Sequence, residues 1–115
     1  MFEKIVKISI LFDYYGKLLN KKQASIIELY YNQDLSLGEI SEILNISRQG
    51  VHDILKRAEN KLFEYENKLG LVEKFNNYSK SAEKIIKIAC SIEEDKYKDI
   101  INDIINEAKI ILREW

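Results

Sequence analysis

The sequence contains no proline, only four glycines and one cysteine among its 115 residues. Without proline no helix is forced to break, and the few glycines leave little material for the tight turns of β-hairpins. The single cysteine, Cys90, excludes an intramolecular disulfide and fits a reducing, cytoplasmic compartment. These absences favour long uninterrupted helices, so we expect an all-α protein.

An excess of charge of one sign is also missing. The formal net charge is −1 at pH 7 and the pI is about 5.9. Domains that bind nucleic acid often carry a basic footprint, which the whole sequence lacks. The charge balance is therefore compatible with a protein or RNA partner as well as with DNA.

No stretch is long and apolar enough to cross a membrane. The first 15 residues, MFEKIVKISILFDYY, are too charged and too few to span a bilayer, and they lack the small-residue cleavage site of a signal peptide. We therefore expect this segment to belong to the fold, with no membrane insertion.

Signatures of catalysis and of cofactor binding are absent as well. His52 and Cys90 occur once each and fall on different predicted helices, and no glycine-rich phosphate loop, HExxH or CxxC pattern occurs. Three successive acids at 93–95 favour a helix start over a metal site. Cys90 follows the apolar position Ala89 and is expected to be a small core residue. We expect no enzyme, no catalytic residues, no metal and no cofactor.

The strongest positive signal lies between Leu37 and Leu62, where the pattern predicts a helix-turn-helix. Ser36 and Glu39 form a capping box that starts its first helix. Asn45 stands where the turn needs a left-handed backbone, and Ser47 caps the second helix. The positions where two crossed helices must touch are all apolar: Ile40, Leu44, Ile46, Val51 and Ile54.

Apolar spacing of three and four residues continues on both sides of this motif and predicts further amphipathic helices. It covers residues 5–19, and Asn20 caps a second helix. The inner, apolar stripe of the first helix is expected to consist of Ile5, Ile8, Phe12, Tyr15 and Leu19. The second helix of the motif runs on to Gly70, which supplies a stop. Two more helices are predicted at 71–89 and 97–115, so helices fill almost the whole chain.

These helices predict two parts: a helix-turn-helix domain at residues 1–70, with its core motif at 36–62, and a C-terminal helical hairpin at residues 71–115. The last helix carries a wider apolar stripe than a hairpin needs. Its second partner is either the first helix of its own chain or a second copy related by a two-fold axis. We favour a homodimer, with these candidate dimerisation residues: Ile101, Ile104, Ala108, Ile111 and Trp115.

The outward face of the motif's second helix is the candidate nucleic-acid-binding site. Arg48 and Gln49 are residue types that bond guanine and adenine edges bidentately, and Lys56 and Arg57 suit phosphate contacts. Asp53 would repel phosphates unless it accepts a hydrogen bond from a cytosine amino group. The candidate residues are Arg48, Gln49, Gly50, His52, Asp53, Lys56 and Arg57. The alternative is an ordinary solvated helix face, or a face that meets another partner.

Two further features bear on the partner. Gly50 occupies the third helical position against helix propensity, which suggests the close approach of a DNA backbone or of the neighbouring helix. Tyr14 and Tyr31 are the tyrosines expected to stay exposed, because Tyr30 faces inward. Core packing explains most of the aromatic set, and stacking on single-stranded RNA is the alternative.

The run from Lys21 to Leu62 resembles the region-4 helix-turn-helix of bacterial sigma factors. Glu39-Ile40-Ser41 matches that family's EIA-type motif. The resemblance implies that the family's base-contacting positions fall on Arg48, Gln49, His52 and Asp53. The core-polymerase and −10 regions of a sigma factor are absent.

Residues 1–75 resemble more closely the YlxM-like family of bacterial helix-turn-helix proteins. The resemblance is carried by LFDYYGKLL at 11–19, YYNQDLSLGEI at 30–40, SRQGVHD at 47–53 and LKRAENKLFEYENKLGL at 55–71. It implies a regulatory protein with a role associated with the signal recognition particle pathway. We expect a DNA-binding regulatory protein. The alternative is a non-enzymatic interaction protein of that pathway, which uses the motif as a scaffold or to bind RNA.

Overall fold

A computed structural model describes residues 2–113, and all regular elements in this range are helical, which confirms the predicted all-α fold. Short segments labelled η are 3-10 turns, except η2, which is π-helical. In chain order the elements are α1 (Phe2–Tyr15), η1 (Gly16–Leu18), α2 (Lys21–Ile27), η2 (Glu28–Asn32), α3 (Leu37–Leu44), α4 (Arg48–Leu69), α5 (Leu71–Cys90), η3 (Asp95–Tyr97) and α6 (Lys98–Arg113).

The chain forms two compact units, Met1–Val72 and Glu73–Trp115. The first unit holds the helix-turn-helix together with the first two residues of α5, and the second holds the rest of α5 and α6. The sequence placed the division at residue 70, where α4 ends.

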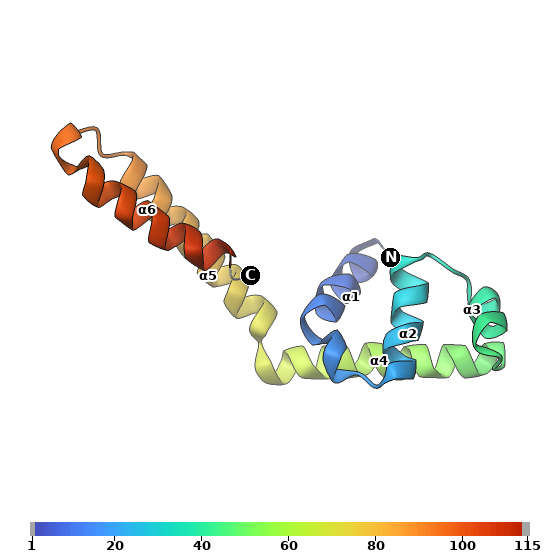
Figure 1. The fold of residues 1–115 in the computed structure, drawn as a ribbon. Coiled ribbons are helices and arrows are strands. Elements are labelled where there is room, and N and C mark those ends of the chain that lie inside the picture. The colour runs from blue at the N-terminus through green and yellow to red at the C-terminus, as the bar shows by residue number, and fades with distance from the viewer. Residues whose placement is uncertain (1, 114–115) are drawn as a thin grey trace. The chain divides into compact units, whose positions relative to one another are not determined.

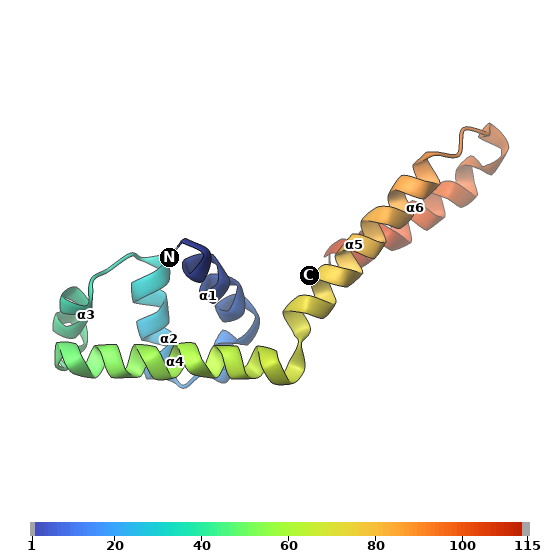
Figure 2. The same ribbon diagram turned by 180° about the vertical axis from the view of Figure 1, so that it is seen from behind.

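In the first unit, α1, α2 and α3 pack against the long helix α4 (Figures 1 and 2). The residues between them are apolar and fully or almost fully buried. They are Ile8 and Leu11 of α1, Ile26 and Ile27 of α2, Ile40 of α3, and Val51, Leu55, Ala58 and Leu62 of α4. Helix α4 therefore gives one face to the core of this unit and leaves the opposite face for solvent.

The local signals of the helix-turn-helix act as the sequence indicates. Ser36 Oγ accepts from the Glu39 backbone N–H at 3.1 Å, and Glu39 accepts from the Ser36 N–H at 3.0 Å. Asn45 ends α3 in the left-handed region, with φ 55°. Ser47 Oγ accepts from the Gly50 N–H at 2.9 Å and so caps α4. A Cβ on Gly50 would lie 3.1 Å from that oxygen, so the close approach expected there is made by the helix's own cap.

Helix α1 departs from the predicted pattern. Ile8 and Tyr15 face the core as expected, but Ile5 is 42% exposed and Leu11 takes the inner position instead. Apolar residues also occupy the side turned away from the core. This outer face of α1 consists of Phe2, Ile5, Val6 and Ile10, all exposed.

A buried tyrosine bonds the end of α4 and the first residue of α5, both within the first unit. Gly70 ends α4 with φ 61°, as predicted from the sequence. The Tyr15 hydroxyl donates to Glu66 Oε1 at 2.5 Å and accepts from the Leu71 N–H at 3.2 Å. Glu66 Oε1 also accepts from the Val72 N–H at 3.1 Å. Two otherwise unsatisfied N–H groups at the start of α5 are therefore bonded within the first unit.

In the second unit, α5 and α6 lie side by side as an antiparallel hairpin (Figures 1 and 2). Small side chains and one isoleucine make its inner contact: Ala82, Ala89, Ile101 and Ala108 are buried. Of the predicted dimerisation residues, Ile101 and Ala108 are therefore buried within the hairpin. Ile104 and Ile111 are 42% and 38% exposed. Trp115 lies outside the described residues.

Cys90, expected in the core, is exposed at the end of α5. The chain leaves the helix at this residue, so no neighbouring helix covers the thiol. No helix within residues 2–113 combines the length and the apolar composition needed to cross a bilayer.

Candidate nucleic-acid interface

The first three turns of α4 present their polar side to solvent. Val51, Leu55 and Ala58 are buried on one side of the helix. The predicted contact residues Arg48, Gln49, Asp53, Lys56 and Arg57 are exposed, and His52 and Gly50 are intermediate. The structure therefore brings the predicted residues together along one helix.

Gln49 and Asp53 are paired with each other. Gln49 Nε2 donates to Asp53 Oδ1 at 3.0 Å, and His52 Nδ1 lies 3.6 Å from the same oxygen. His52 Nδ1 is shielded from solvent and has no hydrogen-bond partner among the described residues. With Oδ1 occupied, Asp53 Oδ2 and Gln49 Oε1 remain as acceptors. The paired side chains therefore suit a donor such as the amino group of cytosine or adenine.

The exposed cations of this helix are not equivalent. Arg48 and Arg57 form no ion pair or hydrogen bond among residues 2–113, so both guanidinium groups remain available. Lys56 Nζ lies 3.7 Å from Glu59 Oε1. The Lys56 charge is thus partly compensated within the protein, and the two arginines are the better phosphate or base ligands.

Glu59 is a buried carboxylate that joins three segments of the first unit. It is 4% exposed and accepts a hydrogen bond from the Tyr31 hydroxyl. Lys4 Nζ of α1 lies 3.3 Å from Glu59 Oε1 on the same carboxylate as Lys56. A buried charge is tolerated only with such partners. The cluster fixes the α4 backbone next to its exposed face.

Sequence reasoning missed this cluster. Tyr31 was expected to be an exposed ring, yet it is half-buried, and so is Tyr14. Glu59 directly follows the core position Ala58 on α4. That neighbourhood was the only local signal of its burial, because its partners come from residues 28 and 55 positions away.

The cluster shifts two ionisation equilibria. The Glu59 carboxylate raises the pKa of Lys4 through a hydrogen bond and its charge. Burial, and then the hydrogen bond to Glu59, raise the pKa of Tyr31 well above its ordinary value near 10. The folded protein therefore keeps the Tyr31 proton at a pH where the unfolded chain loses it.

This difference predicts an alkaline loss of stability. Folding raises the pKa of Tyr31, so the protonated hydroxyl contributes fully to the free energy of unfolding below about pH 10. This contribution falls as the pH rises further. Tyr31→Phe should lower stability at pH 7 by about 0.5–1.5 kcal/mol, the loss of one hydrogen bond. It should also lose less stability than the wild type between about pH 9 and pH 11.

Denaturant titrations at both pH values measure the difference, and Tyr97→Phe on the exposed surface is the control. If the wild type and Tyr31→Phe lose equal stability between these pH values, the Tyr31 hydroxyl does not stabilise the fold through Glu59.

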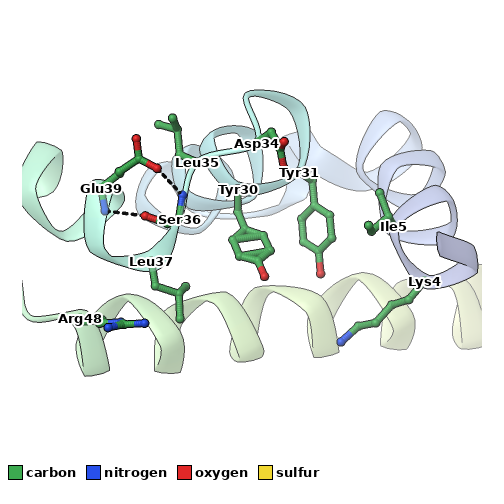
Figure 3. A pocket seen from close by; sticks show the side chains of 10 residues that line it. All are labelled: Lys4, Ile5, Tyr30, Tyr31, Asp34, Leu35, Ser36, Leu37, Glu39 and Arg48. Atoms are coloured by element: carbon green, nitrogen blue, oxygen red, sulfur yellow. Dashed lines mark hydrogen bonds between the residues drawn. The ribbon is translucent and has the colours of Figure 1, made fainter. Parts of the chain in front are cut away.

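An open groove of about 630 Å³ lies beside α4. Figure 3 shows the rings of Tyr30 and Tyr31 pointing toward α4, with Lys4 at one end and Arg48 at the other. Leu37 of α3 also lines it. Because Arg48 belongs both to this groove and to the exposed face of α4, a molecule in the groove would meet the same guanidinium. Within residues 2–113 no group of three or more His, Cys, Asp or Glu side chains is placed to hold a metal ion.

Comparison with known proteins identifies the family. A family model described as "Putative helix-turn-helix protein, YlxM / p13 like" matches residues 2–104. The chain belongs to the UPF0122 family. This confirms the YlxM-like resemblance drawn from the sequence motifs.

Relatives within UPF0122 align over most of their length. A UPF0122 protein from Desulforamulus reducens is 49% identical over 108 residues, which cover 88% of this chain and 92% of that protein. A UPF0122 protein from Clostridium kluyveri is 44% identical over 104 residues, or 90% and 94% of the two chains. One from Caldanaerobacter subterraneus subsp. tengcongensis is 60% identical over 78 residues, or 68% and 67%. The helix-turn-helix of this chain, formed by α3 and α4, agrees with the family's description.

Proposed function

We propose that this UPF0122 protein is a cytoplasmic DNA-binding regulatory protein that inserts the exposed face of α4 into the major groove. The observation that carries the proposal is the exposure of Arg48, Gln49, Asp53 and Arg57 on a helix whose opposite side is buried. An α-helix fits the major groove, where each base pair presents a distinct pattern of donors and acceptors. The sigma region-4 resemblance assigns base contact to the same turns.

The roles follow from the partners of each side chain. Arg48 stands in the first turn with a free guanidinium and is assigned to a guanine edge. Gln49 and Asp53 present acceptors to the amino group of a cytosine or adenine. Arg57 lies farther along the helix and is assigned to a phosphate. His52 lies beside Asp53, with Nδ1 3.6 Å from the carboxylate and no hydrogen bond between them.

The number of phosphates that the exposed face of α4 neutralises sets how strongly binding depends on salt. Within residues 48–57 the cations are Arg48, Lys56 and Arg57, and Glu59 partly compensates Lys56. Each neutralised phosphate contributes about −0.9 to the slope of log K against log salt concentration. We therefore expect a shallow slope for this protein rather than the steep slope of a strongly basic domain.

The salt slope also separates the two neighbouring cations. Arg57→Ala should weaken all duplexes alike and make the slope shallower by about one unit. Lys56→Ala, the matched variant, should change it less, because Lys56 Nζ already lies near Glu59. Fluorescence anisotropy with one duplex between about 50 and 200 mM salt measures both. Identical slopes for the wild type and Arg57→Ala would remove Arg57 from the interface.

We further propose that the protein acts as a homodimer. The exposed isoleucines of the hairpin, Ile104 and Ile111, support this assignment. A dimer that reads two half-sites must place its two α4 helices roughly 34 Å apart, or a multiple of that spacing. Sedimentation at micromolar concentration tests the oligomeric state.

A second candidate function is a non-enzymatic interaction protein of the signal recognition particle pathway, which uses the helix-turn-helix as a scaffold or to bind RNA. The composition lacks a basic footprint, which supports the scaffold role, since RNA and DNA both attract basic surfaces. The RNA-binding role predicts binding to that particle's RNA at about 50 mM salt with no preference among DNA duplexes. Competition between RNA and duplex DNA for the same protein decides between the two functions.

A further inference from the structure

The groove beside α4 holds two free charges of opposite sign. Arg48 on α4 and Asp34 on the loop after η2 line it from opposite walls (Figure 3), and neither forms an ion pair or hydrogen bond in the part of the chain that the structure describes. The other two charged residues of the lining are engaged. Lys4 Nζ lies 3.3 Å from Glu59 Oε1, and the Glu39 carboxylate accepts from the backbone N–H that it caps at the start of α3. The groove therefore offers a ligand one cation and one carboxylate.

The backbone along this groove is irregular at two successive places. The π-helical turn η2 is closed by a hydrogen bond from the Gln33 N–H to the Glu28 carbonyl oxygen at 3.1 Å. Asp34 follows with φ 55°, a left-handed conformation that residues other than glycine rarely adopt. Single π-helical turns and left-handed residues of this kind are both enriched at functional sites. Both features therefore favour a binding function for the groove that they line.

Aromatic and apolar side chains make up the rest of the lining. Tyr30 and Tyr31 of η2 point toward α4 (Figure 3), with their ring centres 5.0 Å apart and packed edge to face. Leu37 of α3 lies near Arg48. The Tyr31 hydroxyl is bonded to Glu59, whereas the Tyr30 hydroxyl has no hydrogen-bond partner among the described residues. The groove therefore suits an apolar, ring-bearing body with a charge at each end.

We propose that this groove binds a small zwitterion with a ring-bearing body, its anionic group on Arg48 and its cationic group on Asp34. The two cations and two carboxylates of the lining cancel, so a ligand without net charge matches the groove best. A guanidinium holds a carboxylate with two parallel hydrogen bonds. The volume of about 630 Å³ is that of a site for a small organic molecule. A short peptide with free termini and one aromatic side chain is a zwitterion of this class.

Occupation of the groove regulates the DNA contact, and this consequence rests on the proposed function. Arg48 is assigned to a guanine edge, and a bidentate pair with the carboxylate of a zwitterion uses the same N–H donors. The zwitterion and the duplex therefore compete for one guanidinium. Each lowers the affinity of the protein for the other by the same factor.

Titration calorimetry of the full-length protein with glycyl-phenylalanyl-glycine, in the absence of DNA, tests the site. Peptides of two and four residues with one phenylalanine bracket the length, because the series spans about 7 to 14 Å when extended. At least one peptide should bind saturably. Acetylating its N-terminus or amidating its C-terminus should each weaken binding at least about tenfold, since each removes one charge pair. Replacing its phenylalanine by alanine should also weaken binding.

Two results of this titration would overturn the proposal. One is the absence of saturation below about 10 mM for every peptide of the series. The other is equal binding of the free, acetylated and amidated peptides, which would mean that the groove does not recognise charge.

Two substitutions assign the ends of the peptide. Arg48→Ala should weaken binding of the free peptide and remove the difference between the free and the amidated peptide. Asp34→Asn should remove the difference between the free and the acetylated peptide, and asparagine tolerates the left-handed backbone at this position. Arg113→Ala and Asp13→Asn, at exposed positions outside the groove, are the matched controls and should bind like the wild type. Differences that persist in Arg48→Ala and Asp34→Asn would overturn the assignment.

Fluorescence anisotropy with a duplex separates this inference from the proposed function. Saturating peptide should lower the DNA affinity of the wild type at least about tenfold. Unchanged DNA affinity with the peptide bound would refute the competition for Arg48. Peptide binding by a protein that binds no duplex would refute the DNA-binding function while the ligand site stands.

Discussion

Replacing Ile40 by alanine is expected to lower the free energy of unfolding by about 2–5 kcal/mol. Ile40 is fully buried where α3 packs against α4. The substitution removes apolar contacts and leaves a cavity that the short helix α3 cannot fill without moving. Because α3 positions the start of α4, the DNA affinity should fall with the stability. Urea denaturation followed by circular dichroism measures the loss.

Ile43 on the same helix provides the matched control. It is 60% exposed, so Ile43→Ala should change the free energy of unfolding by less than about 0.5 kcal/mol. Both variants delete the same atoms from the same helix and differ only in burial. Equal losses would mean that α3 does not pack as described.

Arg48→Ala should cost about 1–3 kcal/mol of binding free energy at a specific duplex, the contribution of one bidentate contact to guanine. Arg48 is exposed in the first turn of α4, and its guanidinium has no partner among the described residues. The preference at one base pair should relax in the same variant. A duplex selected from a random library by the wild-type protein, followed by anisotropy titrations, provides both values.

A cation on the other unit tests whether this effect is local. Lys80 is exposed on α5, so Lys80→Ala changes the net charge equally without touching α4. Its affinity should stay close to that of the wild type. If both substitutions weaken binding alike, the effect is one of overall charge, and Arg48 reads no base.

The parts of the fold that depend on neighbouring residues could be predicted from the sequence. Ser36 with Glu39, Asn45, Ser47 and Gly70 each act within about four residues, and all take the predicted conformation or hydrogen bond. Caps and left-handed turns have strong residue preferences because few side chains satisfy them. Such signals fix where helices start and stop.

Contacts between distant segments could not be predicted in this way. The periodicity of α1 supports two apolar sides, and only the packing decides that Leu11 rather than Ile5 enters the core. Glu59 looks like a surface charge until Tyr31 and Lys4 are brought to it. Along the candidate site, exposure follows helix periodicity, but the compensation of Lys56 by Glu59 requires the fold.

The central claim is that the exposed face of α4 binds duplex DNA. Titrating isotope-labelled protein with a selected duplex, while recording the backbone amide resonances, tests it most directly. The account predicts that the largest shifts fall within residues 48–57 and that a matched RNA produces weaker ones. Shifts confined to the groove lined by Tyr30 and Tyr31 or to the hairpin, with residues 48–57 unchanged, would contradict it.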